Sequence, residues 1–147
     1  MQLGDVQLII TTLMAEHNGG QGMINGDDLI WLAINAYHEA RGESVEGQKA
    51  VCHVVMNRIS KNHPTAESVI LQPFQFSWAN GGNRPPIKNY EALVECYRSA
   101  RSCIAERELG ETFHGADHYF ADTIPMPAWA KNMAKVTKIG HHTFYRS

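Results

Sequence analysis

Apolar residues recur at helical spacing along most of the chain, and this pattern predicts a mainly helical protein. The most apolar segment begins near a capping residue, Asn25 or Asp27, and continues to Tyr37. Apolar side chains cover so much of its surface that we expect this helix at the centre of the core. Further helices are expected over residues 5–17, from Ser44 to 59, from 65 to 71, and over 92–104, the last ended by Gly110.

The pattern changes after Gly110, where aromatic residues replace the helical period. Residues 113–120 predict a loop or short strand, and Pro127 stands where a short helix would start. Apolar positions on both sides of Gly140 predict a small C-terminal hairpin over residues 135–146. The expected fold class is therefore α+β, predominantly α, in a single domain spanning residues 1–147.

Composition and charge narrow the possible partners. Hydrophobic residues make up 44% of the chain and charged residues 19%, with a formal net charge of −2. No cluster of Lys and Arg marks a nucleic-acid surface, and no apolar run approaches the roughly 20 residues of a membrane span. The N-terminus lacks the basic start of a signal peptide, so we expect synthesis in a cytoplasm. The odd count of cysteines (Cys52, Cys96 and Cys103) predicts buried free thiols.

Three carboxylates cluster where the central helix gives way to a turn at Gly42. Glu39 falls at the C-terminal end of the expected helix, where the helix dipole and partial burial both raise the pKa of an acid. Glu43 and Glu46 follow the turn, near the start of the next helix, and should ionise readily. One protonated acid beside ionised neighbours is typical of acid/base catalysis. Alternatively, Glu43 and Glu46 only stabilise the start of that helix.

Other chemistries have weaker support. His38-Glu39 begins like a zinc-protease motif, but Gly42 stands where the second histidine would be. No nucleophile elbow and no phosphate-binding loop occur. His114, His118 and His141 leave a zinc-dependent amidase as an alternative, although their spacing is not diagnostic.

Several motifs, in order, resemble the spore cortex-lytic type cell-wall hydrolases. The resemblance covers residues 29–146, most of the chain, and leaves residues 1–25 as an N-terminal extension without an assigned role. His38 departs from the small residue expected before the family's glutamate. The motifs that carry the resemblance are Glu39-Ala40-Arg41-Gly42-Glu43, the run Glu46 to Val51, Val54 to Arg58, Gln75-Phe76-Ser77, Ala116 to Phe120, Pro127 to Ala130 and Ile139 to Arg146.

The resemblance implies a fold similar to lysozyme-like lytic transglycosylases and cleavage of peptidoglycan glycan strands. Glu39 matches the family's catalytic acid. Phe76, Trp129 and Tyr145 could equally be core aromatics. The positions that the resemblance places along the substrate groove are Gln75, Phe76, Ser77, His118, Tyr119, Trp129 and Tyr145, with Glu43 and Glu46 as further candidates for substrate binding or a second carboxylate.

The implied reaction needs a single acid and no metal or cofactor. Glu39 would protonate the leaving oxygen, and the C6 hydroxyl of N-acetylmuramic acid would replace water, giving a 1,6-anhydro end. Together with the missing signal peptide, this suggests a monomeric phage endolysin that reaches the wall after release. The alternatives are the zinc amidase and a wall-binding or virion protein without activity.

Overall fold

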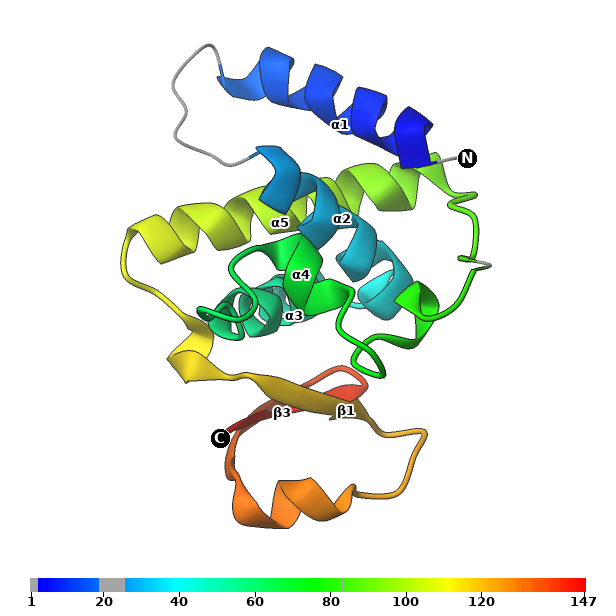
Figure 1. The fold of residues 1–147 in the computed structure, drawn as a ribbon. Coiled ribbons are helices and arrows are strands. Elements are labelled where there is room, and N and C mark those ends of the chain that lie inside the picture. Colours follow the sequence, from blue (N-terminus) through cyan, green and yellow to red (C-terminus); the bar gives the residue numbers. More distant parts are fainter. Residues whose placement is uncertain (1–2, 19–25, 83) are drawn as a thin grey trace.

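The computed structural model describes residues 3–18, 26–82 and 84–147, and it is mainly helical with one small sheet (Figure 1). Its elements are, in order, α1 (Leu3–Asn18), α2 (Gly26–Ala40), α3 (Val45–Asn57), α4 (Ala66–Ile70), the 3₁₀ turn η1 (Ser77–Ala79), α5 (Tyr90–Glu108), η2 (Phe113–Gly115), β1 (His118–Ala121), η3 (Ala128–Asn132), β2 (Ala134–Ile139) and β3 (His142–Arg146). The predicted predominance of helix is confirmed. None of the described helices is long and apolar enough to cross a membrane.

Helix α2 lies at the centre of the core, as its sequence predicts. Every residue from Leu29 to Tyr37 is buried, and α2 packs against α1, α3, α4 and α5. Burying one large aliphatic side chain contributes about 1.5–3 kcal/mol, so this helix anchors the rest of the helical part. The placement also fixes its C-terminal end, where Glu39 lies.

The predicted caps set the starts of the neighbouring helices. Gly42 has a φ of 87°, which allows the chain to reverse after α2. The Ser44 hydroxyl then accepts a hydrogen bond from the Gly47 amide and caps α3. Thr65 caps α4 through a reciprocal capping box with Ser68. These local signals decide where α3 and α4 begin.

The sheet has three antiparallel strands in the order β1-β3-β2. The predicted hairpin is confirmed as β2 and β3, and the aromatic segment becomes a strand, β1, on the other edge of β3. Tyr119 pairs with Phe144, and His118 with Tyr145. In Figure 1 the helices lie on one side of the sheet and η3 lies on the other.

The hairpin turn is attached to the helical part through Glu43. Gly140 has a φ of 56°, and the Glu43 carboxylate accepts a 3.0 Å hydrogen bond from the His141 amide. A Cβ atom added at Gly140 would lie 2.7 Å from a Glu43 carboxylate oxygen. The turn therefore requires glycine for its backbone angle and for the space that Glu43 occupies.

Gly140→Ala should lower the free energy of unfolding by about 2–3 kcal/mol, because strain in the left-handed region adds to the displacement of Glu43. Gly81→Ala is the matched control. Gly81 also has a positive φ, 84°, but a Cβ there would meet nothing within 4 Å, so its loss should stay near 1 kcal/mol. Urea unfolding of both variants checks this, and equal losses would contradict the role given to Glu43.

The three cysteines are free and buried, in agreement with the sequence prediction. Cys52 lies in α3, and Cys96 and Cys103 lie in α5. Burial raises the pKa of the Cys96 thiol to about 12, so this thiol packs as a small apolar side chain.

Candidate active site

Glu39 and Tyr119 meet where the end of α2 faces the sheet. Glu39 is the next-to-last residue of α2 and is half-buried. The Tyr119 hydroxyl, from β1, donates a hydrogen bond to the Glu39 carboxylate. Their separation of 80 positions in sequence explains why helix and strand patterns alone could not pair them.

The environment of Glu39 favours its protonated form. Burial raises the pKa of the Glu39 carboxyl above its ordinary value, while the Tyr119 hydrogen bond and the Arg58 charge lower it by smaller amounts. The sequence argument also gave a raised pKa, partly from the helix dipole, but burial is the largest cause in the structure. A carboxylic acid kept protonated near neutral pH can act as a general acid.

Arg58 joins the parts of the chain that surround Glu39. It caps the C-terminal end of α3, and its Nε donates a 2.6 Å hydrogen bond to the Asp117 carbonyl. Its Nη1 donates to the Gln75 side-chain oxygen at 3.1 Å, so Gln75 is brought to the site. Arg58 belongs to one of the motifs that carry the family resemblance, but its sequence context predicts no role. No local signal distinguishes it from a surface arginine, because its partners come from two distant loops.

The remaining residues of the Gln-Phe-Ser motif differ in their surroundings. Phe76 is only 2% exposed and packs under the Arg58 guanidinium, 5.4 Å from the ring centre. This burial agrees with the alternative that Phe76 is a core aromatic that packs beneath Arg58, and a contact with substrate stays a prediction. Ser77 is exposed and begins η1, in agreement with a surface position.

His38, the departure from the family pattern, is accommodated by an aromatic neighbour. Its ring stacks on Trp78, with ring centres 4.5 Å apart, and the Trp78 indole donates a 2.8 Å hydrogen bond to Asn35. Burial and the nearby Arg41 charge lower the pKa of His38 to about 4. At neutral pH His38 is thus uncharged and adds no positive charge beside Glu39.

The sheet separates the aromatic residues that the sequence analysis grouped together. Because side chains alternate along a strand, His118 points to the opposite face of β1 from Tyr119. There His118 contacts Trp129, and Tyr145, which is 5% exposed, packs against Trp129 and Phe120. Trp129 and Tyr145 therefore lie on the opposite face of the sheet from Tyr119, as the alternative of packing aromatics expects, and their place along the substrate groove stays a prediction.

Glu43 does not stand free as a second acid. Its carboxylate accepts the His141 amide hydrogen, and the His142 imidazole lies 3.5 Å away. Burial lowers the pKa of His142, which keeps that ring uncharged at neutral pH. The structure thus gives Glu43 a role in attaching the hairpin. This role differs from both sequence alternatives, which were a site carboxylate and an acid that stabilises the start of the next helix.

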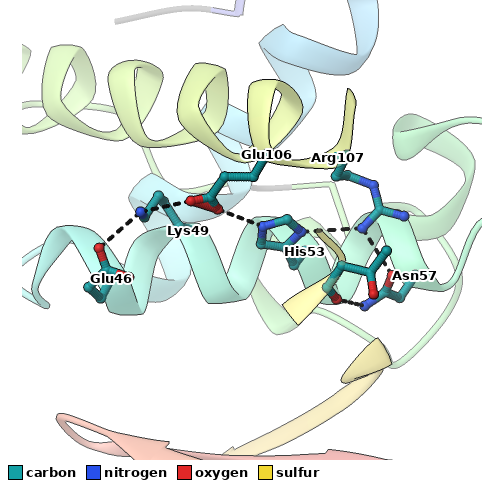
Figure 2. Close-up of polar contacts among 7 residues, drawn as sticks. Glu46, Lys49, His53, Asn57, Glu106 and Arg107 are labelled. Carbon is teal, nitrogen blue, oxygen red and sulfur yellow. Dashed lines mark hydrogen bonds and ion pairs between the residues drawn. The ribbon is translucent and has the colours of Figure 1, made fainter. Parts of the chain in front are cut away.

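Glu46 lies at one end of a chain of polar contacts between α3 and α5 (Figure 2). It is 72% exposed in its side chain and pairs with Lys49 at 2.9 Å. Lys49 also contacts Glu106, which bonds to the buried His53 at 2.9 Å. Arg107 continues the chain from His53 to Asn57. The pair of Glu46 and Lys49 lies near the surface and contributes little stability. Through Lys49, Glu46 is linked to α5.

A cavity of about 430 Å³ opens beside this network. Its lining includes Glu46, His53, Glu106 and Phe113 but not Glu39. Glu46 and Glu106 of the lining both pair with Lys49, and Glu106 also bonds to His53. We assign no chemistry to this cavity.

The histidines of the zinc alternative have separate partners. His118 contacts Asp117, His141 contacts Asp122, and His114 lines the cavity. Within the described part of the chain, no three His, Cys, Asp or Glu side chains converge in a way that could hold a metal ion.

Replacing Glu39 by Gln should change how stability depends on pH. Folded Glu39 retains its proton to higher pH than in the unfolded chain, so wild-type stability falls as pH rises from about 4.3 through the folded pKa. Glu39→Gln lacks this loss. The stability of Glu39→Gln minus that of wild type should therefore be larger at pH 8 than at pH 4. An unchanged difference between the two pH values in urea unfolding would contradict the raised pKa.

The fold and the half-buried acid agree with the class of protein that sequence comparison identifies. A family described as Cell Wall Hydrolase matches residues 42–145, and the chain belongs to this family of enzymes. The matched region begins three residues after Glu39, so the family match does not itself include the candidate acid.

The chain is also similar to curated spore cortex-lytic enzymes. That of Bacillus subtilis is 27% identical over 84% of this chain and 39% of its own length, and that of Oceanobacillus iheyensis is 28% identical over 88% and 47%. The chain thus spans less than half the length of these relatives.

Solved structures show which part of those relatives the chain matches. The catalytic domain of the Bacillus cereus SleB protein has a TM-score of 0.67 and 27% identity, with 86% of this chain and 94% of that one covered. The Bacillus anthracis SleB catalytic domain, described as a germination-specific lytic transglycosylase, has a TM-score of 0.66 and 26% identity, covering 85% and 98%. The expected lysozyme-like fold is confirmed.

Proposed function

We propose that this protein cleaves the β-1,4 bond between N-acetylmuramic acid and N-acetylglucosamine in peptidoglycan, as a lytic transglycosylase. The observation that carries the proposal is Glu39: a half-buried acid with a raised pKa, bonded to Tyr119 and close to the charge of Arg58. Membership in the Cell Wall Hydrolase family supports the substrate. The description of the Bacillus anthracis relative supports the reaction type.

Glu39 would act twice in this reaction. As an acid it donates its proton to the glycosidic oxygen while the bond from that oxygen to C1 of the muramic acid breaks. As a carboxylate it then takes the proton from the C6 hydroxyl of the same sugar, whose oxygen bonds to C1. The products are a 1,6-anhydro end and a free C4 hydroxyl, no water is consumed, and Glu39 regains its proton.

The surroundings of Glu39 favour this route over hydrolysis with two carboxylates. Hydrolysis by the common mechanisms needs a second carboxyl at a defined separation, as nucleophile or base. Glu43 is engaged by the hairpin turn, and Glu46 is paired with Lys49. The intramolecular hydroxyl needs only one acid. Hydrolysis to a reducing end is the second candidate reaction.

A phage lysin that acts on the wall after release, as a monomer, remains our proposal for the biological setting.

Digestion of purified peptidoglycan strands, followed by mass spectrometry, tests the reaction. We expect 1,6-anhydro ends, which are one water lighter than the corresponding reducing ends. Reducing ends alone would replace the transglycosylase with a hydrolase, and uncut strands would overturn the proposed function.

Activity should persist in excess EDTA, which separates this enzyme from a zinc amidase. Glu39→Gln should lower the rate at least about 100-fold while the protein stays folded.

Tyr119→Phe should shift the pH dependence of the reaction to higher pH. In the wild-type protein the hydrogen bond from Tyr119 lowers the pKa of Glu39. Removing this bond should therefore raise that pKa further. Because the acid must carry its proton, the alkaline limb of kcat/KM against pH should move upward, even if the maximum rate falls. A limb that stays in place or moves to lower pH would show that Tyr119 does not set the pKa of the acid.

A further inference from the structure

Phe74 combines two unfavourable properties, and among the described residues no packing contact of its ring offsets them. Its side chain is 91% exposed, so the ring gains almost no burial. Its φ is 65°, in the left-handed region where a side chain costs about 1–2 kcal/mol and glycine fits best. Strained residues that persist without a structural reason concentrate at functional sites.

Phe113 shows what an offset for the same strain looks like. It also has a positive φ, 52°, but its ring packs edge-on against Phe144, with ring centres 5.2 Å apart, and faces His53 at 6.3 Å. Packing in the core thus explains the conformation of Phe113. The exposed ring of Phe74 has no comparable explanation.

Phe74 directly precedes a residue that contacts the site. Its neighbour Gln75 accepts the hydrogen bond from Arg58, the residue whose charge acts on Glu39. The Phe74 amide donates to the Asn80 side chain at 3.3 Å, and the Gln75 amide donates to the Gln72 carbonyl at 3.3 Å. These bonds fix the backbone on both sides, so the ring is presented to solvent from a defined turn.

We propose that Phe74 is a substrate-binding residue whose ring packs against a sugar of the glycan strand next to the cleaved bond. The inference rests on the proposed function. The apolar face of a pyranose ring, formed by its C–H groups, and the methyl of an N-acetyl group match an exposed, rigid aromatic ring. Binding buries the ring, which is exposed in the free protein. This burial offsets the backbone strain of Phe74 in the bound state.

Three variants at this position separate binding from folding. Phe74→Gly removes the ring and relieves the strain, Phe74→Asn removes the ring but keeps a side chain that tolerates a positive φ, and Phe74→Trp keeps an aromatic surface. Leu109→Gly is the control, since Leu109 is also 80% exposed but belongs to another segment, the C-cap of α5.

Affinity for soluble glycan strands, measured by calorimetry in a Glu39→Gln background, reads out binding without cleavage. We expect Phe74→Gly and Phe74→Asn to weaken binding about three- to tenfold with melting temperatures equal to or above their parent. Phe74→Trp and Leu109→Gly should bind as the parent does. With Glu39 intact, Phe74→Gly should raise KM by a similar factor and change kcat by less than about twofold.

Unchanged affinity in both Phe74→Gly and Phe74→Asn would overturn the proposal, as would a fall in melting temperature that accounts for weaker binding. Failure of the proposed function looks different. Wild-type protein would then leave the strands uncut, while the affinities in the Glu39→Gln background still decide whether Phe74 binds them.

Discussion

The hydrogen bond between Tyr119 and Glu39 joins the two parts of the structure on which any chemistry here depends. Glu39 belongs to the most buried helix of the fold, and Tyr119 belongs to an edge strand of a small sheet. A small sheet of this kind is stable when its hydrophobic face is packed, so contacts with the helices set its position relative to α2. Phe144, beside Tyr119 on β3, packs into the helical part, and Glu43 holds the hairpin turn. Together these contacts place the phenol on the acid.

Arg58 adds an electrostatic constraint to this arrangement. Its positive charge favours the ionised form of Glu39, whereas burial favours the protonated form, and burial prevails. Glu39 must donate a proton and later recover one. Opposing influences on its pKa suit this task, because neither the protonated nor the ionised form is strongly favoured. Arg58 is itself held by the Asp117 carbonyl, Gln75 and the ring of Phe76. The charge therefore stays beside the acid without forming a direct ion pair that would fix it as a carboxylate.

Local sequence signals predicted much of the fold and only part of the site. Capping residues such as Ser44 and the helical period of α2 depend on neighbours a few positions away, so they are readable from sequence. The polarity of α2 also identified Glu39. The roles of Arg58 and Glu43 could not be read in this way, because their partners lie in distant loops. The sequence motifs also could not show that Tyr119 lies on the opposite sheet face from Trp129 and Tyr145, because a motif match carries no information about which face each side chain takes.

The far face of the sheet then has a different purpose from the one its aromatic residues suggest. The helices lie on one side of the sheet, and η3 lies on the other (Figure 1). Trp129, carried by η3, closes over Tyr145 and Phe120 on that side. Because His118 and Phe120 flank Tyr119 on β1, packing on the far face restrains the strand at the positions on either side of the phenol. The aromatic motif thus contributes to the site by holding β1 in place, which explains why residues that do not approach Glu39 belong to the same pattern as the acid.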